Sequence, residues 1–181
     1  HYRKLVDRLK GRLAEATGAD WCVQQANVSQ SRRGALRGIH FVETPPGQAK
    51  YVTCPAGAVL DFAIDIRVGS PTFGQWDTVL LDSVDRKAIY LSEGLGHAFV
   101  ALTDDAVVSY LVSDTYNPTA EHGINPLDEQ IALRFPAEAG EPLLSPKDVE
   151  APSLAEALAQ GLLPTWEGSK AFYAQLNGAS A

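Results

Sequence analysis

The sequence has 181 residues, of which 45% are hydrophobic and 20% are charged, so it has the composition of an ordinary globular protein and enough chain for one domain with a full core. The formal net charge of −7 argues against a general binder of nucleic acid or of anionic membranes, because both need a basic face. No apolar run reaches the length of about 18 residues that spans a membrane, and no secretory signal pattern is present. We therefore expect residues 1–181 to form a single cytoplasmic domain.

Residues 1–18 have helical periodicity. Leu5, Leu9 and Leu13 recur every fourth residue, and charged residues fill the remaining positions. This pattern predicts an amphipathic helix that ends near Gly18.

From residue 21 the period changes to two. In the predicted strand over residues 21–31, Gln25, Asn27 and Ser29 lie on one side. Such a row of amide and hydroxyl groups either faces water or lines a polar cavity inside a barrel.

The clearest predicted strand covers residues 58–67, where Leu60 and Phe62 lie on one face and Asp61 and Asp65 on the other. The other predicted strands are residues 36–42, 48–54, 76–82, 87–91, 97–100 and 106–112. Turn residues separate these strands at intervals of about ten residues, which is the rhythm of an all-β sandwich or barrel.

The alternation weakens after residue 116. Ser153 and Glu156 form a capping box that predicts a helix as far as Gln160, with Gly161 as its end. We expect the tail to pack on the barrel through its aromatic residues Trp166, Phe172 and Tyr173.

A group of cationic residues surrounds His40. Arg37 precedes it by three residues, and Lys50 follows it after a turn at residues 45–47. A lone strand histidine is ordinarily a core or surface residue, but two neighbouring strands joined by this turn would bring His40 and Lys50 together. A base, a fixed cation and a guanidinium in one pocket are suited to removing a proton from a carbon next to a carbonyl.

A metal site is not expected. The histidines His1, His40, His97 and His122 are scattered, and Val42 occupies the position where an H-x-H pair would place a second ligand beside His40. Cys22 and Cys54 are too few for a disulfide framework. No cofactor-binding motif follows a predicted strand.

Several stretches resemble the dTDP-4-keto-6-deoxyhexose 3,5-epimerases, the family of dTDP-4-dehydrorhamnose 3,5-epimerase. The stretches are QANVS at 25–29, RGALRGIHF at 33–41, PPGQAK at 45–50, DIRVGSPTFG at 65–74, GLGHAF at 94–99 and LSPKD at 144–148. They keep the family's order and spacing, and the stretch after residue 67 looks most like the branch that makes deoxysugars for antibiotics.

The resemblance implies a metal-free, cupin-like jelly-roll barrel, here with short N-terminal and C-terminal helices, that forms a cytosolic homodimer and needs no cofactor. By position, His40 matches the catalytic base and Asp148 the aspartate that orients it. Lys50 matches the cation beside the substrate's C4 oxygen, and Tyr110 matches the acid on the opposite face.

Further positions match residues that bind the substrate, a dTDP-linked 4-keto-6-deoxysugar. Arg37, Gln25 and Asn27 match residues around the sugar and diphosphate, and His97 and Tyr116 match pocket-lining positions.

The sequence departs from the family pattern in two places. The N-terminal strands of the family, with their Arg-Gly-x-Phe segment, have no match, and residues 121–128 replace a tryptophan-bearing segment. We predict an epimerase that inverts C3, C5 or both. The alternatives are a sugar-nucleotide ketoisomerase on the same barrel and a non-catalytic cupin that binds sugar nucleotides.

Overall fold

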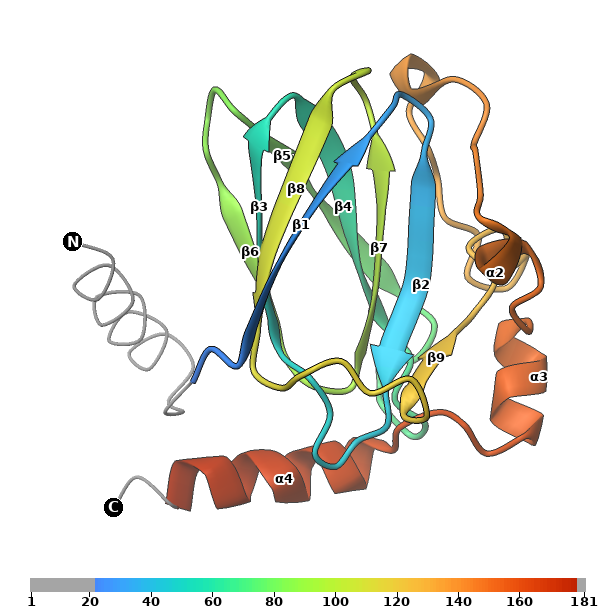
Figure 1. Cartoon of the computed structure of the whole chain (residues 1–181). Coiled ribbons are helices and arrows are strands. Elements are labelled where there is room, and N and C mark those ends of the chain that lie inside the picture. Colours follow the sequence, from blue (N-terminus) through green and yellow to red (C-terminus); the bar gives the residue numbers. More distant parts are fainter. Residues whose placement is uncertain (1–21, 179–181) are drawn as a thin grey trace.

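The computed structural model describes residues 22–178. The helix predicted for residues 1–18 lies outside the described residues. The described chain first forms a series of antiparallel strands and then a segment with short helices, which runs along one side and beneath the ends of the strands (Figure 1).

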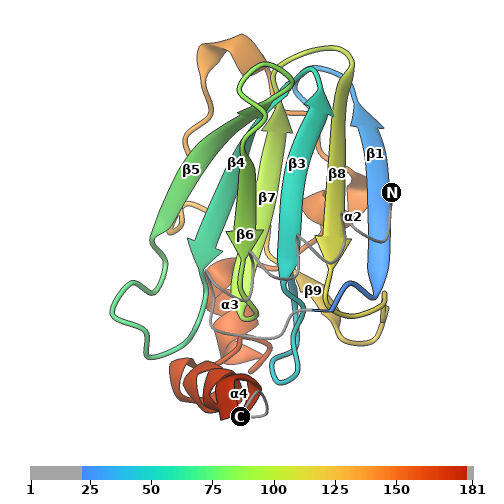
Figure 2. The ribbon, with the colours of Figure 1, turned by 90° about the vertical axis from the view of Figure 1, so that its left-hand side faces the viewer.

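The strands form two antiparallel sheets that pack face to face. The strands are β1 (Gln25–Ser31), β2 (Leu36–Val42), β3 (Lys50–Ala56), β4 (Ala58–Asp65), β5 (Trp76–Asp82), β6 (Ala88–Leu91), β7 (Leu95–Ala101), β8 (Ala106–Val112) and β9 (Glu121–Gly123). One sheet has the order β1-β8-β3-β6, and the other has the order β5-β4-β7-β2-β9. Figure 2 shows the four-stranded sheet in front of the five-stranded one. This is the jelly-roll sandwich that the resemblance implied.

Most predicted strands are confirmed, and β2, β5 and β8 have the predicted bounds. The strand predicted at residues 97–100 begins earlier, at Leu95, and β9 was not predicted. The predicted pairing of the strands on either side of residues 45–47 is wrong. Strand β2 pairs with β7 and β9, whereas β3 pairs with β8 and β6, so this connection crosses from one sheet to the other.

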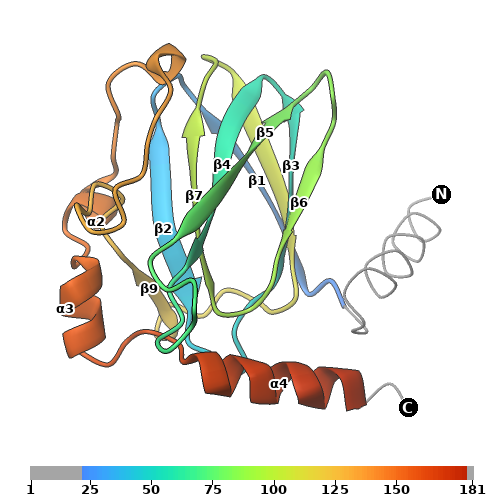
Figure 3. The same cartoon turned by 180° about the vertical axis from the view of Figure 1, so that it is seen from behind.

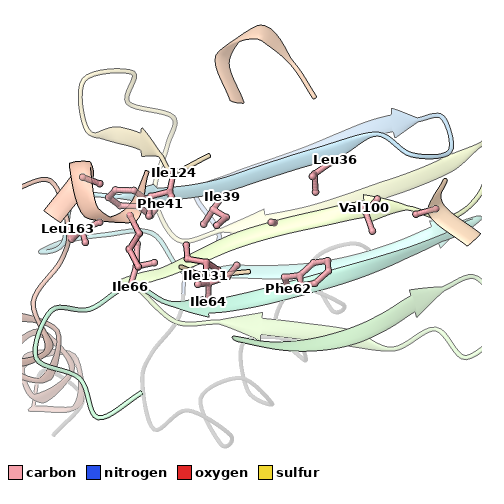
Figure 4. Close-up of a cluster of buried hydrophobic side chains, with 14 residues drawn as sticks. Leu36, Ile39, Phe41, Phe62, Ile64, Ile66, Val100, Ile124, Ile131 and Leu163 are labelled. Atoms are coloured by element: carbon pink, nitrogen blue, oxygen red, sulfur yellow. The ribbon is translucent and has the colours of Figure 1, made fainter. Parts of the chain in front are cut away.

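Two hydrophobic clusters hold the layers together. The first lies between the sheets and includes Val52, Phe99 and Val108. The second lies on the outer face of the five-stranded sheet, where Phe62 and Ile64 pack against the later part of the chain (Figure 4). The alternation predicted for residues 58–67 is thereby confirmed, because its apolar face lies in the outer cluster and its aspartates point inward.

The later part of the chain contains a 3-10 turn (Ala137–Ala139) and three helices, α2 (Pro146–Val149), α3 (Leu154–Ala159) and α4 (Trp166–Gly178). The predicted capping box of α3 is present. Helices α2 and α3 lie beside β2 and β9, and α4 runs beneath the strand ends (Figure 3). None of the helices in the described residues is long and apolar enough to cross a membrane.

The tail packs on the end of the sandwich at two aromatic residues. The guanidinium of Arg67 lies 4.5 Å from the ring centre of Trp166, and the Tyr173 hydroxyl donates to the carbonyl of Glu93. The predicted contact of the tail with the barrel is confirmed at these two positions.

A β-bulge in β2 determines which side chains face inward. Arg37 is opposite Phe99 and His40 is opposite His97, so Gly38 and Ile39 together face the single residue between those partners. In a regular strand, residues three apart point to opposite faces. The extra residue puts Arg37 and His40 on the same face.

Replacing Gly38 with alanine should destabilise the protein by about 3 kcal/mol, because two costs add. Gly38 has a φ of 116°, and a Cβ atom there would lie 2.4 Å from the carbonyl oxygen of His97 and 2.7 Å from the Cα of Ala98. The free energy of unfolding from urea titration measures the effect.

The matched control is Gly69→Ala. Gly69 also has a positive φ, 85°, but no atom lies within 4 Å of its added Cβ. This control should cost only about 1 kcal/mol. Equal losses for the two variants would show that the close approach at the bulge imposes no constraint.

Candidate active site

The polar row of β1 faces the space between the sheets. Gln25 and Asn27 are half-buried, whereas the alternating residues Ala26 and Val28 are exposed. The polar row could have faced water or lined the interior, and in the structure it lines the interior.

The predicted catalytic side chains come from both sheets. His40 in β2 pairs with His97 in β7, while Lys50 and Tyr110 belong to the four-stranded sheet. Lys50 alternates in phase with the buried Val52, and Tyr110 packs on the inner cluster, so both point inward. His40 and Lys50 therefore face the same interior from opposite sheets, not from a shared hairpin.

His40 and Asp148 form a hydrogen-bonded pair. The Nε2 atom of His40 lies 2.7 Å from Oδ1 of Asp148, which is 3% exposed. The other carboxylate oxygen, Oδ2, accepts a 2.7 Å hydrogen bond from the Ser145 hydroxyl. Burial alone would raise the pKa of Asp148, but the hydrogen bonds from His40 and Ser145 outweigh it and lower the pKa.

The pairing assigns the proton on the neutral imidazole. An ionised Asp148 can only accept a hydrogen bond, so Nε2 of His40 carries the hydrogen. The lone pair of the neutral ring is then on Nδ1. Nδ1 is therefore the atom of His40 that can take a proton from a bound molecule.

Lys50 brings its amino group into this interior. Burial lowers the pKa of Lys50, and the nearby negative charges of Glu121 and Asp61 oppose that shift. Within residues 22–178, no carboxylate forms an ion pair with Lys50. In its protonated form Lys50 is thus available to meet negative charge that develops on a ligand.

Tyr110 is suited to donating a proton. Burial raises the pKa of Tyr110, the charge of Glu121 raises it further, and Arg37 acts in the opposite direction. The phenol therefore stays protonated at neutral pH. Tyr110 is opposite Asn27 and Val52 in the sheet register, on the wall that faces His40.

A second carboxylate–imidazole pair lies deeper between the sheets. Nε2 of His97 is 2.9 Å from Oδ2 of Asp61, which is fully buried. Among the described residues, the other oxygen of Asp61 has no hydrogen-bond partner. Asp61 was not predicted as a site residue. Its only signal in the sequence is a carboxylate on the inward side of a strand whose other side is apolar.

Three of the remaining predicted binding residues, Gln25, Asn27 and Tyr116, are linked to one another by hydrogen bonds at β1. The Gln25 amide donates to Oδ1 of Asn27 at 2.8 Å and accepts from the backbone N–H of Tyr116 at 3.0 Å. The side chain of Tyr116 is 56% exposed, and Nε of Arg37 donates to the Ser31 hydroxyl at 3.4 Å. These contacts leave the Tyr116 ring uncovered next to the polar row of β1.

A cavity of about 430 Å³ opens beside the His40–Asp148 pair. Its lining includes Glu121 and Lys147, which were not predicted as site residues. Glu121 lies in the short strand β9, and Lys147 directly precedes Asp148, so no regular pattern marks either of them. The cavity gives a ligand access to the imidazole from the β9 edge.

The part of the chain that the structure describes contains no cluster of side chains that could bind a metal ion. No group of three or more His, Cys, Asp and Glu side chains in this part is arranged to hold an ion. Cys22 and Cys54 are both free thiols.

A sandwich whose inner faces carry a carboxylate-paired histidine, a buried lysine and a protonated tyrosine can accommodate acid–base chemistry of the kind that isomerases use. A model of the dTDP-4-dehydrorhamnose 3,5-epimerase family matches residues 7–156. The chain belongs to this family, and it is an epimerase of the dTDP-sugar class. The family assignment from the sequence stretches is thereby confirmed.

Similar proteins include a dTDP-4-dehydrorhamnose 3,5-epimerase and epimerases of deoxysugars. The chain is 57% identical over 160 residues to dTDP-4-dehydrorhamnose 3,5-epimerase of Mycolicibacterium smegmatis, which covers 88% of this chain and 78% of that protein. The crystal structure of NovW, a 4-keto-6-deoxy sugar epimerase from the novobiocin cluster of Streptomyces spheroides, has a TM-score of 0.85 and 55% identity over 88% of this chain and 79% of that one.

ChmJ, a 3′-monoepimerase from Streptomyces bikiniensis solved with dTDP-quinovose, has a TM-score of 0.89 and 48% identity, over 93% of this chain and 84% of that one. Relatives with one inversion and with two inversions are thus similar to this chain to comparable degrees.

Proposed function

We propose that the protein inverts C3, C5 or both in a dTDP-linked 4-keto-6-deoxyhexose, with His40 as the base, Lys50 as the cation at the C4 oxygen and Tyr110 as the acid. The observation that supports this most directly is the His40–Asp148 pair, which faces a wall that carries Lys50 and Tyr110. Gln25, Asn27, Arg37, His97 and Tyr116 would bind the sugar nucleotide.

The first half of the reaction breaks a C–H bond next to the ketone. Nδ1 of His40 takes the proton, and the electron pair of the bond moves into an enolate whose charge lies on the C4 oxygen. The ammonium of Lys50 stabilises that charge as it develops, which is an interaction stronger in the transition state than in the ground state. Asp148 stabilises the imidazolium that forms.

The second half restores the C–H bond from the other side. Tyr110 lies on the opposite sheet and donates its phenolic proton to the carbanion carbon, which inverts the centre. The enzyme then holds an imidazolium and a tyrosinate, and exchange of protons with solvent returns both to their starting states. Each acid or base contributes roughly 10²- to 10⁴-fold.

Incubation with dTDP-4-keto-6-deoxyglucose in D₂O tests this function. We expect deuterium to enter C3, C5 or both, because the abstracted proton is replaced by one that has equilibrated with solvent. Absence of label with several dTDP-4-keto sugars, in spite of dTDP binding, would support the non-catalytic cupin instead. A product whose carbonyl has moved to another carbon would identify a ketoisomerase, and NMR of the product distinguishes the two.

We also propose that the protein acts as a homodimer in the cytoplasm. Val28 is 71% exposed on the outer face of the four-stranded sheet, where Tyr51 and Leu111 are also partly exposed, and such an apolar face is suited to a second copy. The two free cysteines fit a reducing compartment. A sedimentation experiment that finds only monomers at micromolar concentration would contradict the dimer.

A further inference from the structure

Ser145 occupies the second oxygen of the carboxylate that holds His40. Its hydroxyl donates to Oδ2 of Asp148 at 2.7 Å, while Oδ1 of the same carboxylate lies 2.7 Å from Nε2 of His40. We propose that Ser145 is a positioning residue for the base, because it fixes the plane of the Asp148 carboxylate and keeps this carboxylate ionised. The inference rests on the proposed role of His40.

The orientation of the carboxylate depends on this contact. The last torsion of an aspartate side chain is broad, so one hydrogen bond at Oδ1 leaves the carboxylate free to turn. The second bond at Oδ2 holds the group from the other side. Ser145 itself is held in place, because its Oγ also accepts from the backbone N–H of Asp148 at 3.2 Å as the N-cap of α2. The hydroxyl hydrogen is therefore directed at the carboxylate.

The charge of the carboxylate also depends on this contact. Asp148 is almost fully buried, and burial disfavours an ionised carboxylate. A hydroxyl that donates to an anion forms a short, charge-assisted hydrogen bond, which favours the ionised form. Only an ionised Asp148 both fixes the hydrogen on Nε2 and stabilises the imidazolium, so Ser145 acts on the base through Asp148.

The chain offers a matched control at Ser153. Its Oγ accepts from the backbone N–H of Glu156 at 3.2 Å and contacts Oε2 of the same residue at 2.8 Å, so it repeats the local geometry of Ser145. Ser153 caps α3, and Glu156 is exposed. A substitution there removes the same kind of cap and the same kind of contact, but away from His40.

The experiment compares S145A, S145G, S145T and S153A by the pH dependence of deuterium incorporation and by thermal unfolding. S145A and S145G should lower kcat by roughly 10-fold, which is the lower end for a hydrogen bond to a charged group. Their acid limb should move to higher pH by about one unit, because loss of a donor to the anion makes protonation of the His40–Asp148 pair easier.

The variants separate the hydroxyl donor from the helix cap. Glycine keeps most of the capping ability of serine, so S145G isolates the loss of the donor. S145T keeps the hydroxyl and should retain the wild-type profile, whereas S153A should lower the melting temperature and leave the profile unchanged. A wild-type profile in S145G would overturn the role of Ser145.

His40→Asn, measured alongside, keeps this outcome apart from failure of the proposed function. If a folded His40→Asn variant retains exchange, the base is assigned wrongly, and the inference about Ser145 falls with it. If His40→Asn loses exchange while S145A and S145G match the wild type, only the role of Ser145 is wrong.

Discussion

Replacing His40 with asparagine is expected to reduce deuterium incorporation by roughly 10²- to 10⁴-fold while the fold is retained. Asparagine has no nitrogen lone pair that can accept a proton at neutral pH, so the C–H bond has no base. Asparagine is shorter than histidine, and its amide nitrogen corresponds to Nδ1 and not to Nε2, so Oδ1 of Asp148 loses its donor while Oδ2 keeps that of Ser145. The measurement is the rate of label entry at C3 and C5 by NMR.

The fold of this variant is checked separately by far-UV circular dichroism and by thermal unfolding. Asp148→Asn is the informative companion, because it keeps the imidazole but removes the charge behind it, and we expect it to lose less activity than His40→Asn. A folded His40→Asn variant that still exchanges at the wild-type rate would mean that another group removes the proton.

Replacing Lys50 with methionine is expected to lower kcat by roughly 10²- to 10³-fold, as loss of one group that stabilises an oxyanion typically does. Methionine has similar length and no charge, so the enolate oxygen would develop its charge without a cation. Lys87→Met is the control, because Lys87 is an exposed lysine paired with Asp85, and it precedes Ala88, at the end of β6 away from Leu91, the residue opposite Lys50. An unchanged kcat in Lys50→Met would exclude the lysine from charge stabilisation.

The same lysine predicts an alkaline limit to activity. The role of Lys50 requires the protonated form, and burial lowers the pKa of Lys50. As the pH rises through this lowered pKa, the ammonium is lost before an ordinary lysine would lose its proton. In the pH profile of kcat, the alkaline limb should therefore lie at a lower pH than the ordinary lysine pKa of 10.5. A limb that persists in Lys50→Met at the same pH would assign it to another group.

Much of the sandwich could be predicted because several of its strands alternate regularly between polar and apolar residues. In residues 58–65 the large apolar side chains Leu60, Phe62 and Ile64 recur at every second position, and all three pack in the outer cluster. Strand β9 and helix α2 could not be predicted, because they are three and four residues long and form only where β2 and the later chain segment place them. Local periodicity is too short there to carry a signal.

The way in which His40 and Lys50 come to face each other could not be predicted from the sequence, for a different reason. The turn at residues 45–47 favours a hairpin, but both edges of β2 and of β3 are already occupied by other strands. The side chains still converge, because the sandwich brings the two inner faces together. Arg37 shares the face of His40 only through the bulge at Gly38, which a regular strand period does not predict.

The candidate site residues also differ in how far the sequence alone could predict them. His40 and Lys50 stand out from the sequence because of their charged neighbours, whereas Asp148 and Tyr110 were predicted only from the family resemblance. Asp61 looked like the polar side of an ordinary strand. Its burial depends on the opposite sheet, which no single stretch of sequence contains.

The contact between His40 and Asp148 also has a consequence for the order of folding. The two residues are 108 positions apart, and the chain between them forms most of both sheets. Closing so long a loop is entropically costly until the intervening strands are in place. We therefore expect His40 to acquire its carboxylate partner only after the sandwich has formed and the later segment has docked on it. A chain that is still being synthesised has the imidazole but lacks its carboxylate partner, so the proposed base is complete only at the end of folding.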